Sequence, residues 1–224
     1  MKVRIKRQKN AESTAYWQTF DYNGGDTVSV ATVLDALNYT DDLYDEDGNS
    51  APRIRWECSC MQAVCGGCAM VINGVPALAC NTFLRDLKGD ELVLEPLTKF
   101  PVVADLVVDR GVIYENLQRA ELYSENAKAA TGCDQAHRYS VAKCLKCGLC
   151  LEVCPNYRPG EDFFGAQFAN DVYFLHSRGQ AEKKQLKKAY NRHFASGCSK
   201  ALSCQSICPA GIETLTSILK MNRF

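Results

Sequence analysis

The chain has 224 residues, of which 46% are hydrophobic, and its 26 basic side chains balance its 26 acidic ones. A formal net charge of zero gives no global field to attract nucleic acid, so a DNA- or RNA-binding role is disfavoured. No apolar run reaches the ~18–20 residues of a membrane span. The alternating basic and apolar residues at positions 1–7 differ from a signal peptide, so we expect neither a membrane span nor an export signal.

Strand patterns dominate the first hundred residues. Alternating polar and apolar side chains, bounded by turn residues, predict strands at residues 3–6, 16–20, 69–72 and 92–94. Apolar side chains at helical spacing predict a short helix at residues 28–37. The acidic segment 41–48 fails the spacing of a calcium loop, because its ligand positions fall on Leu43 and Ile54. We therefore expect a solvated surface loop there.

From residue 104 onward the pattern changes to helix. Periodic apolar residues predict helices at residues 112–123, 166–176 and 180–193. The last of these is strongly basic, which indicates either a solvated helix face or contact with an acidic partner or an anionic membrane surface. The change of pattern predicts a domain boundary near residue 105, with domains at 1–105 and 106–224.

The thirteen cysteines are the most informative part of the composition. Disulfide frameworks are typical of short exported chains, whereas this chain is long and has an odd number of cysteines. Several of its cysteines stand three positions apart, which is a common spacing of metal ligands. In a reducing compartment we therefore expect iron–sulfur clusters, in preference to disulfides or zinc.

The first cysteine run has the plant-type spacing for a [2Fe–2S] cluster, C-x4-C-x2-C-x11-C. Its predicted ligands are Cys60, Cys65, Cys68 and Cys80. Counting from Cys58 instead leaves six residues before the next ligand, which does not fit. Two irons need four thiolates, three from a tight loop and one from a separate strand. Gly66 and Gly67 allow the loop backbone to approach the cluster and aim its N–H groups at the sulfur atoms.

Two further runs predict a pair of neighbouring clusters. Residues 144–155 read C-x2-C-x2-C-x3-C-P, a bacterial run whose fourth cysteine ligates the other cluster in two-cluster ferredoxins. Residues 198–209 repeat this layout with Ala201 at the second ligand position. Exchange of the fourth ligands assigns a [4Fe–4S] cluster to Cys144, Cys147, Cys150 and Cys208. The other cluster receives Cys154, Cys198 and Cys204.

The second of these clusters has three cysteines where a cubane needs four. Because Ala201 has no ligating atom, the most economical inference is a [3Fe–4S] cluster. A [4Fe–4S] cluster with water or hydroxide on its fourth iron is the alternative. The three ligand sets use eleven of the thirteen cysteines and leave Cys58 and Cys133 as expected bystanders.

No other reactive motif stands out. The three histidines are scattered and form no Rieske spacing with the cysteines, and there is neither a glycine-rich phosphate loop nor a nucleophile elbow. We expect a protein that moves electrons, with the bond-making chemistry at either end belonging to its partners.

The order of these motifs resembles the iron–sulfur subunit of the succinate dehydrogenase and fumarate reductase family. The resemblance covers nearly the whole chain and includes the three cysteine runs, residues 74–80 that close the first run, and residues 99–109 at the predicted domain junction. It implies an α+β fold with an N-terminal β-grasp, plant-type ferredoxin domain at 1–105. An α-helical ferredoxin domain at 106–224 follows.

The resemblance also implies partners. A flavoprotein subunit with FAD interconverts succinate and fumarate in such complexes, and the [2Fe–2S] cluster lies nearest the flavin. The [3Fe–4S] cluster lies nearest a quinone that binds against a membrane anchor subunit, either of cytochrome b type or free of haem. This arrangement implies that the chain is cytoplasmic and peripheral on the inner face of the cell membrane.

Two departures from the family pattern concern the quinone end. A tryptophan near the first bacterial run and a histidine beside a three-iron ligand are typical of the succinate dehydrogenase branch. Here the corresponding positions fall on residues 157–160 and on Ser199, and the opening Cys154-Pro155-Asn156-Tyr157 is similar to fumarate reductases. One alternative is a related flavoprotein complex that reduces another unsaturated acid or uses a soluble partner. A zinc-bound scaffold without a redox role is a further alternative.

Overall fold

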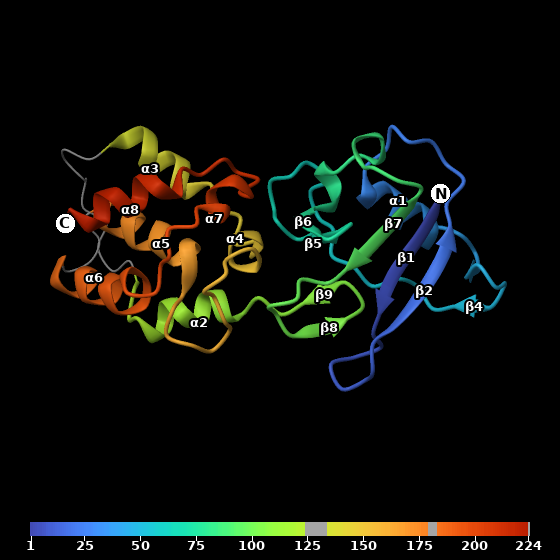
Figure 1. The fold of residues 1–224 in the computed structure, drawn as a ribbon, viewed down its shortest axis with the longest axis horizontal. Coiled ribbons are helices and arrows are strands. Elements are labelled where there is room, and N and C mark those ends of the chain that lie inside the picture. The colour runs from blue at the N-terminus through green and yellow to red at the C-terminus, as the bar shows by residue number, and fades with distance from the viewer. Residues whose placement is uncertain (124–133, 179–182, 224) are drawn as a thin grey trace. The chain divides into compact units, whose positions relative to one another are not determined.

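The computed structural model describes residues 1–123, 134–178 and 183–223 (Figure 1). It divides into two compact units, Met1–Asp109 and Arg110–Phe224. The sheet lies in the first unit and the α-helices, except for α1, lie in the second, so the predicted α+β class is confirmed. Cys133 and residues 180–182 of the predicted basic helix lie outside the described residues. Within the described ranges, no helix has the length and apolar character needed to cross a lipid bilayer.

A five-stranded sheet organises the first unit, with strand order β2-β1-β7-β5-β6. The strands are β1 (Lys2–Arg7), β2 (Tyr16–Asp21), β5 (Ala69–Ile72), β6 (Val75–Leu78) and β7 (Glu91–Glu95). The pairing of β1 with β7 is parallel and places Ile5 beside Leu94, whereas the other pairs are antiparallel. Four of these strands were predicted from the sequence, and β6 was not.

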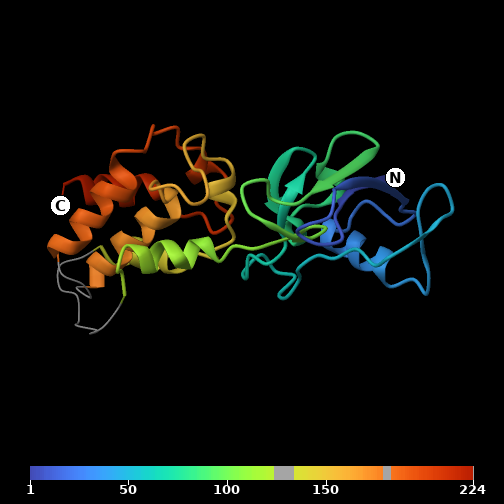
Figure 2. The same cartoon turned by 90° about the horizontal axis from the view of Figure 1, so that it is seen from below.

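The core of the first unit follows from the alternation in β1, which turns Val3 and Ile5 inward and buries both completely. Helix α1 (Val30–Asn38) lies across one face of the sheet (Figures 1 and 2). Its apolar face is fully buried, and the side chain of Ser29 caps its N-terminus by accepting the N–H of Thr32 at 3.3 Å. The predicted helix at 28–37 is therefore confirmed, with its start two residues later.

Two small hairpins and two short 3-10 helices complete the first unit. The elements are β3 (Leu43–Tyr44), β4 (Ser50–Ala51), η1 (Ala79–Asn81), η2 (Leu84–Asp86), β8 (Val102–Ala104) and β9 (Val107–Val108). The acidic segment 41–48 is largely exposed as expected, but it is part of the β3–β4 hairpin and buries Leu43. The carboxylate of Asp45 accepts the N–H groups of Asp47 and Asn49, which fixes the turn.

Helix α5 is the central element of the second unit. The helices are α2 (Val112–Arg119), α3 (Gln135–Ala142), α4 (Leu149–Glu152), α5 (Gly165–Arg178), α6 (Lys183–Tyr190), the π-helix η3 (Asn191–Ala195), α7 (Ser203–Ser206) and α8 (Thr214–Asn222). Helices α2, α3, α4, α6 and α8 and the π-helix all contact α5 (Figures 1 and 2). The core around it includes Phe164, Phe168 and Phe194, none of them more than 2% exposed.

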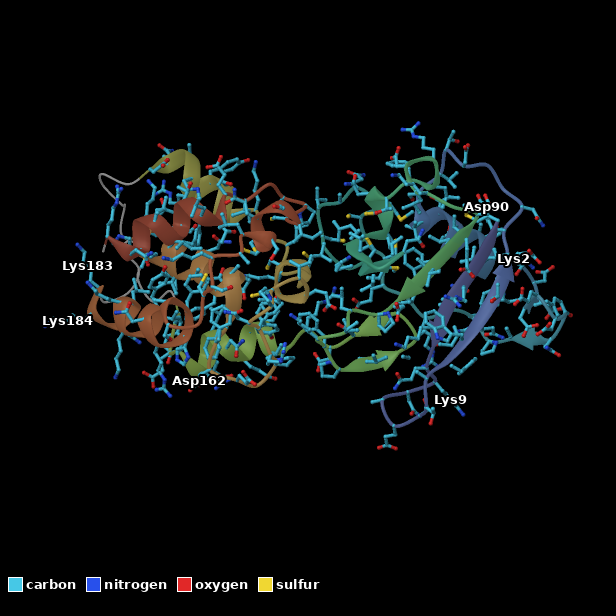
Figure 3. All side chains as sticks on the ribbon, viewed as in Figure 1. Lys2, Lys9, Asp90, Asp162, Lys183 and Lys184 are labelled. Atoms are coloured by element: carbon cyan, nitrogen blue, oxygen red, sulfur yellow. The ribbon has the colours of Figure 1, made fainter. Side chains whose placement is uncertain are left out.

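The basic helix has one apolar and one charged face. In α6, Leu186 and Ala189 are buried, whereas Lys183, Lys184, Lys187 and Lys188 are exposed. The side chains of Lys183 and Lys184 point outward from the helix (Figure 3). The expected α-helix through residue 193 ends at Tyr190, where the backbone changes to the π-helix η3.

Candidate metal centres

The predicted ligands of the first run are brought together at the end of one hairpin. Cys68 precedes β5 directly, and Cys80 lies in η1 just after β6, so the pairing of β5 with β6 places them side by side. Their sulfur atoms are 3.3 Å apart, which is too long for a disulfide. Each of the twelve described cysteines is a free thiol.

Backbone N–H groups of the loop 60–68 point at these sulfur atoms. Cys60 Sγ accepts the N–H groups of Gln62 and Val64, both at 3.4 Å. Cys80 Sγ accepts the N–H of Ala63 at 3.3 Å, and Cys65 Sγ accepts that of Gly67 at 3.5 Å. The left-handed backbone of Met61, Ala63 and Gly66, with φ of 54°, 58° and 77°, allows these N–H groups to converge. Converging N–H groups form an anion-binding concavity, which fits a set of thiolates.

The environment separates the acidities of these thiols. The N–H groups of Gln62 and Val64 lower the pKa of Cys60 to about 7, whereas burial raises the pKa of Cys68 to about 12. A buried thiol of this kind becomes a thiolate when a cation binds it, because coordination removes the proton. The Cys60 thiol is thus partly ionised near neutral pH, whereas the Cys68 thiol ionises only when it coordinates a metal.

Cys58 differs from the four predicted ligands. It is exposed, and its Sγ lies 3.1 Å from the Sδ of Met61. Partial desolvation of its sulfur and the neighbouring cysteines raise its pKa, whereas the loop N–H groups lower the pKa of Cys60. The structure therefore places Cys58 beside the loop rather than within its set of N–H bonds.

The two bacterial-type runs in the second unit share one backbone conformation. Lys146 and Lys200 occupy equivalent positions and have φ of 53° and 60°. Gly148 and Leu202 are equivalent too, with φ of 86° and 58°, and each is the N-cap of a four-residue helix, α4 or α7. Ala201 therefore stands where Cys147 stands in the first run. The second run therefore keeps the backbone of a four-ligand loop but lacks the thiol at its second ligand position.

One cavity of the second unit brings the first run together with Cys208 of the second. Its sulfur-bearing lining consists of Cys144, Cys147, Cys150, Cys204 and Cys208. Burial raises the pKa of Cys144 and of Cys150, and it raises that of Cys147 to about 11. The nearby Cys208 raises all three further. Thiols so buried and so close together fit a site that holds cations.

A second cavity brings Cys154 of the first run together with the second run. Cys154, Cys198 and Cys204 line it, and so do Ser199 and Ala201. Cys204 lines both cavities, but its largest electrostatic neighbours are Cys154 and Cys198. The apolar part of the lining includes Phe163, Phe194 and Ile218.

The described residues contain no group of three or more His, Cys, Asp or Glu side chains drawn tightly enough around one point to hold a single metal ion. The cysteines surround a loop interior and two cavities instead.

Four polar residues of the first cavity were not predicted from the sequence. Lys146, Gln167, Asn170 and Thr214 line it together with the cysteines. Gln167 and Asn170 are three positions apart on α5 and almost fully buried. The signal available in the sequence was this pair of amides within a helix whose periodic apolar residues predict a buried face.

Comparisons with known proteins agree with this geometry. Residues 2–115 match the family described as a 2Fe-2S iron-sulfur cluster binding domain, and residues 140–212 match a 4Fe-4S dicluster domain. The fumarate reductase iron–sulfur subunit of Escherichia coli is 30% identical over 200 residues, which cover 85% of this chain and 79% of that protein. The chain belongs to the family of succinate dehydrogenase and fumarate reductase iron–sulfur subunits.

Other members of the family match over a similar length. The succinate dehydrogenase iron–sulfur subunit of Bacillus subtilis is 29% identical over 98% of this chain and 90% of that protein. A chain of the Mycobacterium smegmatis Sdh1 complex in its apo form superimposes with a TM-score of 0.79, at 23% identity, over 99% of this chain and 93% of that one. The likeness supports the predicted fold, a plant-type ferredoxin domain followed by a helical one.

Proposed function

We propose that this chain is the electron-transfer subunit of a succinate dehydrogenase or fumarate reductase complex. It passes electrons between the FAD of a partner flavoprotein and a quinone at a membrane anchor subunit. The observation that carries the proposal is the exchange of cysteines between the two cavities, in which Cys208 joins the first run and Cys154 joins the second. Exchanged fourth ligands are the arrangement of two-cluster ferredoxins.

The proposed ligand sets follow the loops and cavities. A [2Fe–2S] cluster is held by Cys60, Cys65, Cys68 and Cys80. A [4Fe–4S] cluster is held by Cys144, Cys147, Cys150 and Cys208. A [3Fe–4S] cluster is held by Cys154, Cys198 and Cys204. Clusters of these types, when bound, accept and donate one electron at a time.

The chain's own residues stabilise the negative charge of these groups and exclude water. The N–H groups of Gln62, Ala63 and Val64 donate to thiolate sulfur in the first unit. In the second unit, Phe163 and Phe194 form an apolar wall beside Cys198. Hydrogen bonds to sulfur and the exclusion of solvent are the means by which a protein sets cluster potentials.

The three-iron assignment rests on Ala201. Its side chain lines the second cavity at the position that Cys147 occupies in the first. A methyl group offers no lone pair, so the iron at that corner has no protein ligand. A [4Fe–4S] cluster with water or hydroxide at that corner is the competing assignment, and it predicts a different iron content and a different paramagnetic state.

The partners are proposed from the family. They are an FAD-containing flavoprotein and a membrane anchor, of cytochrome b type or free of haem, which places the chain peripherally on the cytoplasmic face of the membrane. The departures at Tyr157 and Ser199 leave another acceptor as the alternative. Tyr157 is buried and its pKa is raised to about 12, and Ser199 lines the three-cysteine cavity.

Purification of the intact complex tests the proposal. We expect about nine irons per copy of this chain, a paramagnetic [3Fe–4S] signal in the oxidised protein, and succinate–fumarate interconversion linked to a quinone. A colourless protein that contains zinc would overturn the whole proposal. A complex with three clusters that acts on a different acid, or lacks an anchor subunit, would support the proposed clusters. It would overturn the proposed substrate or electron acceptor.

A further inference from the structure

One buried side chain that lines the first cavity of the second unit has a polar atom without a hydrogen-bond partner among the described residues. Asn170, on α5, is 5% exposed and lines the cavity beside the four proposed [4Fe–4S] ligands. Its Nδ2 donates to Thr214 Oγ1 at 3.1 Å. Its Oδ1 is buried and, among the described residues, finds no hydrogen-bond donor. Buried amides normally satisfy both ends, so this one requires an explanation.

The chemistry of the cavity decides which end of the amide suits it. Thiolates and inorganic sulfides accept hydrogen bonds and have no proton to donate. An amide oxygen that faces them stays unsatisfied, whereas an amide N–H that faces them is satisfied. The hydroxyl of Thr214 can donate as well as accept, so it can serve either end of the amide.

A rotation of the Asn170 amide by 180° therefore satisfies every group. Its oxygen then accepts the Thr214 hydroxyl proton, and its NH2 takes the position of the unpartnered Oδ1. The oxygen and nitrogen of an amide are distinguished only by their hydrogen-bond partners, so this assignment is a matter of chemistry.

Residues next to Asn170 connect this part of α5 to the ligand loop. Asp171, the next residue on α5, forms an ion pair with Lys146, which lies between Cys144 and Cys147. The amide of Gln167 also donates to Asp171. The pair ties α5 to the ligand loop, and the carboxylate offsets the charge of Lys146.

We propose that the side-chain amide of Asn170 donates a hydrogen bond to the sulfur of the [4Fe–4S] site, with Thr214 as its anchor, and that this bond raises the reduction potential of that site. The inference rests on the proposed ligand set of this cavity. A donor to sulfur stabilises the added negative charge of the reduced state, so its loss favours the oxidised state. Asn170 acts as a positioning and tuning residue and is not a ligand.

The test is Asn170→Leu in the intact complex, followed by redox titration of both cubane-type sites. Leucine has a similar volume, has no donor and excludes water. We expect unchanged iron and sulfide content, and a [4Fe–4S] midpoint that falls so that the reduced-to-oxidised ratio at a fixed potential drops at least threefold, about 30 mV for a one-electron couple. The three-iron site serves as an internal reference, and its midpoint should stay constant.

Asn116→Leu is the matched control. Asn116 is 3% exposed on α2 and does not line the cavity. If replacing any buried amide has a general effect, the [4Fe–4S] midpoint shifts in both variants, or the midpoints of both sites shift equally in one variant. Either result overturns the proposal. An unchanged [4Fe–4S] midpoint in an Asn170→Leu protein with full iron content overturns it as well. A wild-type complex without a [4Fe–4S] signal refutes the proposed function instead.

Two further measurements apply if Asn170→Leu does not take up iron. Asn170→Met supplies a flexible apolar side chain without a donor and is judged by the same criterion. The wild-type complex, labelled with 15N at asparagine side-chain amides, is examined by pulsed paramagnetic resonance of the reduced [4Fe–4S] site. We expect a 15N coupling, and its absence overturns the proposal.

Discussion

The Nε of Arg7 lies 3.0 Å from the Oδ1 of Asp105, and both side chains are at least 95% buried. The guanidinium of Arg7 also donates to Gln18 and to the carbonyl oxygens of Pro52 and Arg53. The pair thus joins the end of β1 to the β8–β9 hairpin and to the segment that leads into the ligand loop.

Asp105→Ala should destabilise the first unit by about 3–5 kcal/mol, because it leaves the Arg7 charge buried and unpaired. It also removes the acceptor of the Gln8 and Arg55 N–H groups, each at 2.9 Å. Urea unfolding followed by the [2Fe–2S] absorption band measures the loss. Asp21→Ala removes one of the two acidic partners of the exposed Lys2, the other being Glu46, and should leave the urea midpoint unchanged. Equal midpoints for the two variants would show that burial of the Arg7–Asp105 pair is unimportant.

The ligand assignment in the first run can be tested by two alanine substitutions two positions apart. Cys60→Ala removes the sulfur that accepts two loop N–H groups, so we expect loss of the [2Fe–2S] signal and of about two irons per chain. Cys58→Ala should keep both the signal and the iron, because the sulfur of Cys58 lies against Met61 and, among the described residues, outside the set of loop N–H bonds. Paramagnetic resonance of the reduced protein and iron analysis decide between the variants. Loss of the signal in Cys58→Ala and its retention in Cys60→Ala would make Cys58 the first ligand in place of Cys60.

Ala201→Cys should convert the three-iron site towards [4Fe–4S]. The second run already has the backbone of a four-ligand run, with Lys200 and Leu202 in the left-handed region, so a thiol at this position needs no refolding. We expect the oxidised [3Fe–4S] signal to disappear and the midpoint of the site to fall. Ala201→Gly, which adds no ligand, should keep the signal. An unchanged signal in Ala201→Cys would count against the assigned position.

The buried His137 gives the second unit a pH dependence. Its Nε2 lies 2.9 Å from Ser217 Oγ, its ring packs against Tyr173, and burial lowers its pKa below the ordinary 6.5. Of the charged groups near it, Asp134 and Glu213 oppose this shift and Lys220 adds to it. Below pH 6.5 the unfolded chain therefore binds a proton that the folded chain does not, so stability falls as the pH falls.

His137→Gln removes this proton and keeps a polar atom for Ser217. The difference in unfolding free energy between wild type and variant should be constant above pH 7.5. Between pH 6.5 and 5.5 it should change in favour of the variant, by at most about 1.4 kcal/mol per pH unit. The pKa of His176 is lowered by burial as well, so the wild-type profile alone does not isolate His137. Parallel profiles of the two proteins across this range would refute the assignment.

The sequence revealed most where the chemistry is local. Cysteine spacings of two to four residues predict a ligand loop without knowledge of the fold, and the alternation in β1 predicts its buried face. Strand β6 was not predicted, and its Pro76 is a residue type that strands disfavour. Its place at the edge of the sheet makes the missing N–H harmless. The helix predicted at 112–123 ends at Arg119, and Glu121, with φ of 53°, follows in a left-handed conformation that its residue type does not announce.

Contacts between segments that are distant in the sequence could not be predicted, for a different reason. The partners of Arg7 and Asn170 come from segments far apart in the chain, and their roles depend on burial that only the packed units define. The repeat of left-handed residues in the two bacterial-type runs was equally hidden, because Leu202 stands where Gly148 would have revealed it.

The parallel pairing of β1 with β7 sets an order of events during synthesis. Lys6 of β1 bonds to Glu95 of β7 across 89 positions, so the sheet cannot close until β7 has left the ribosome. The loop 60–68 emerges earlier, and Cys60 gains the N–H bonds that lower its pKa to about 7 only once the loop has folded. The thiols of this loop are therefore exposed until the sheet closes. This interval is when oxidants compete with the assembly machinery for Cys60.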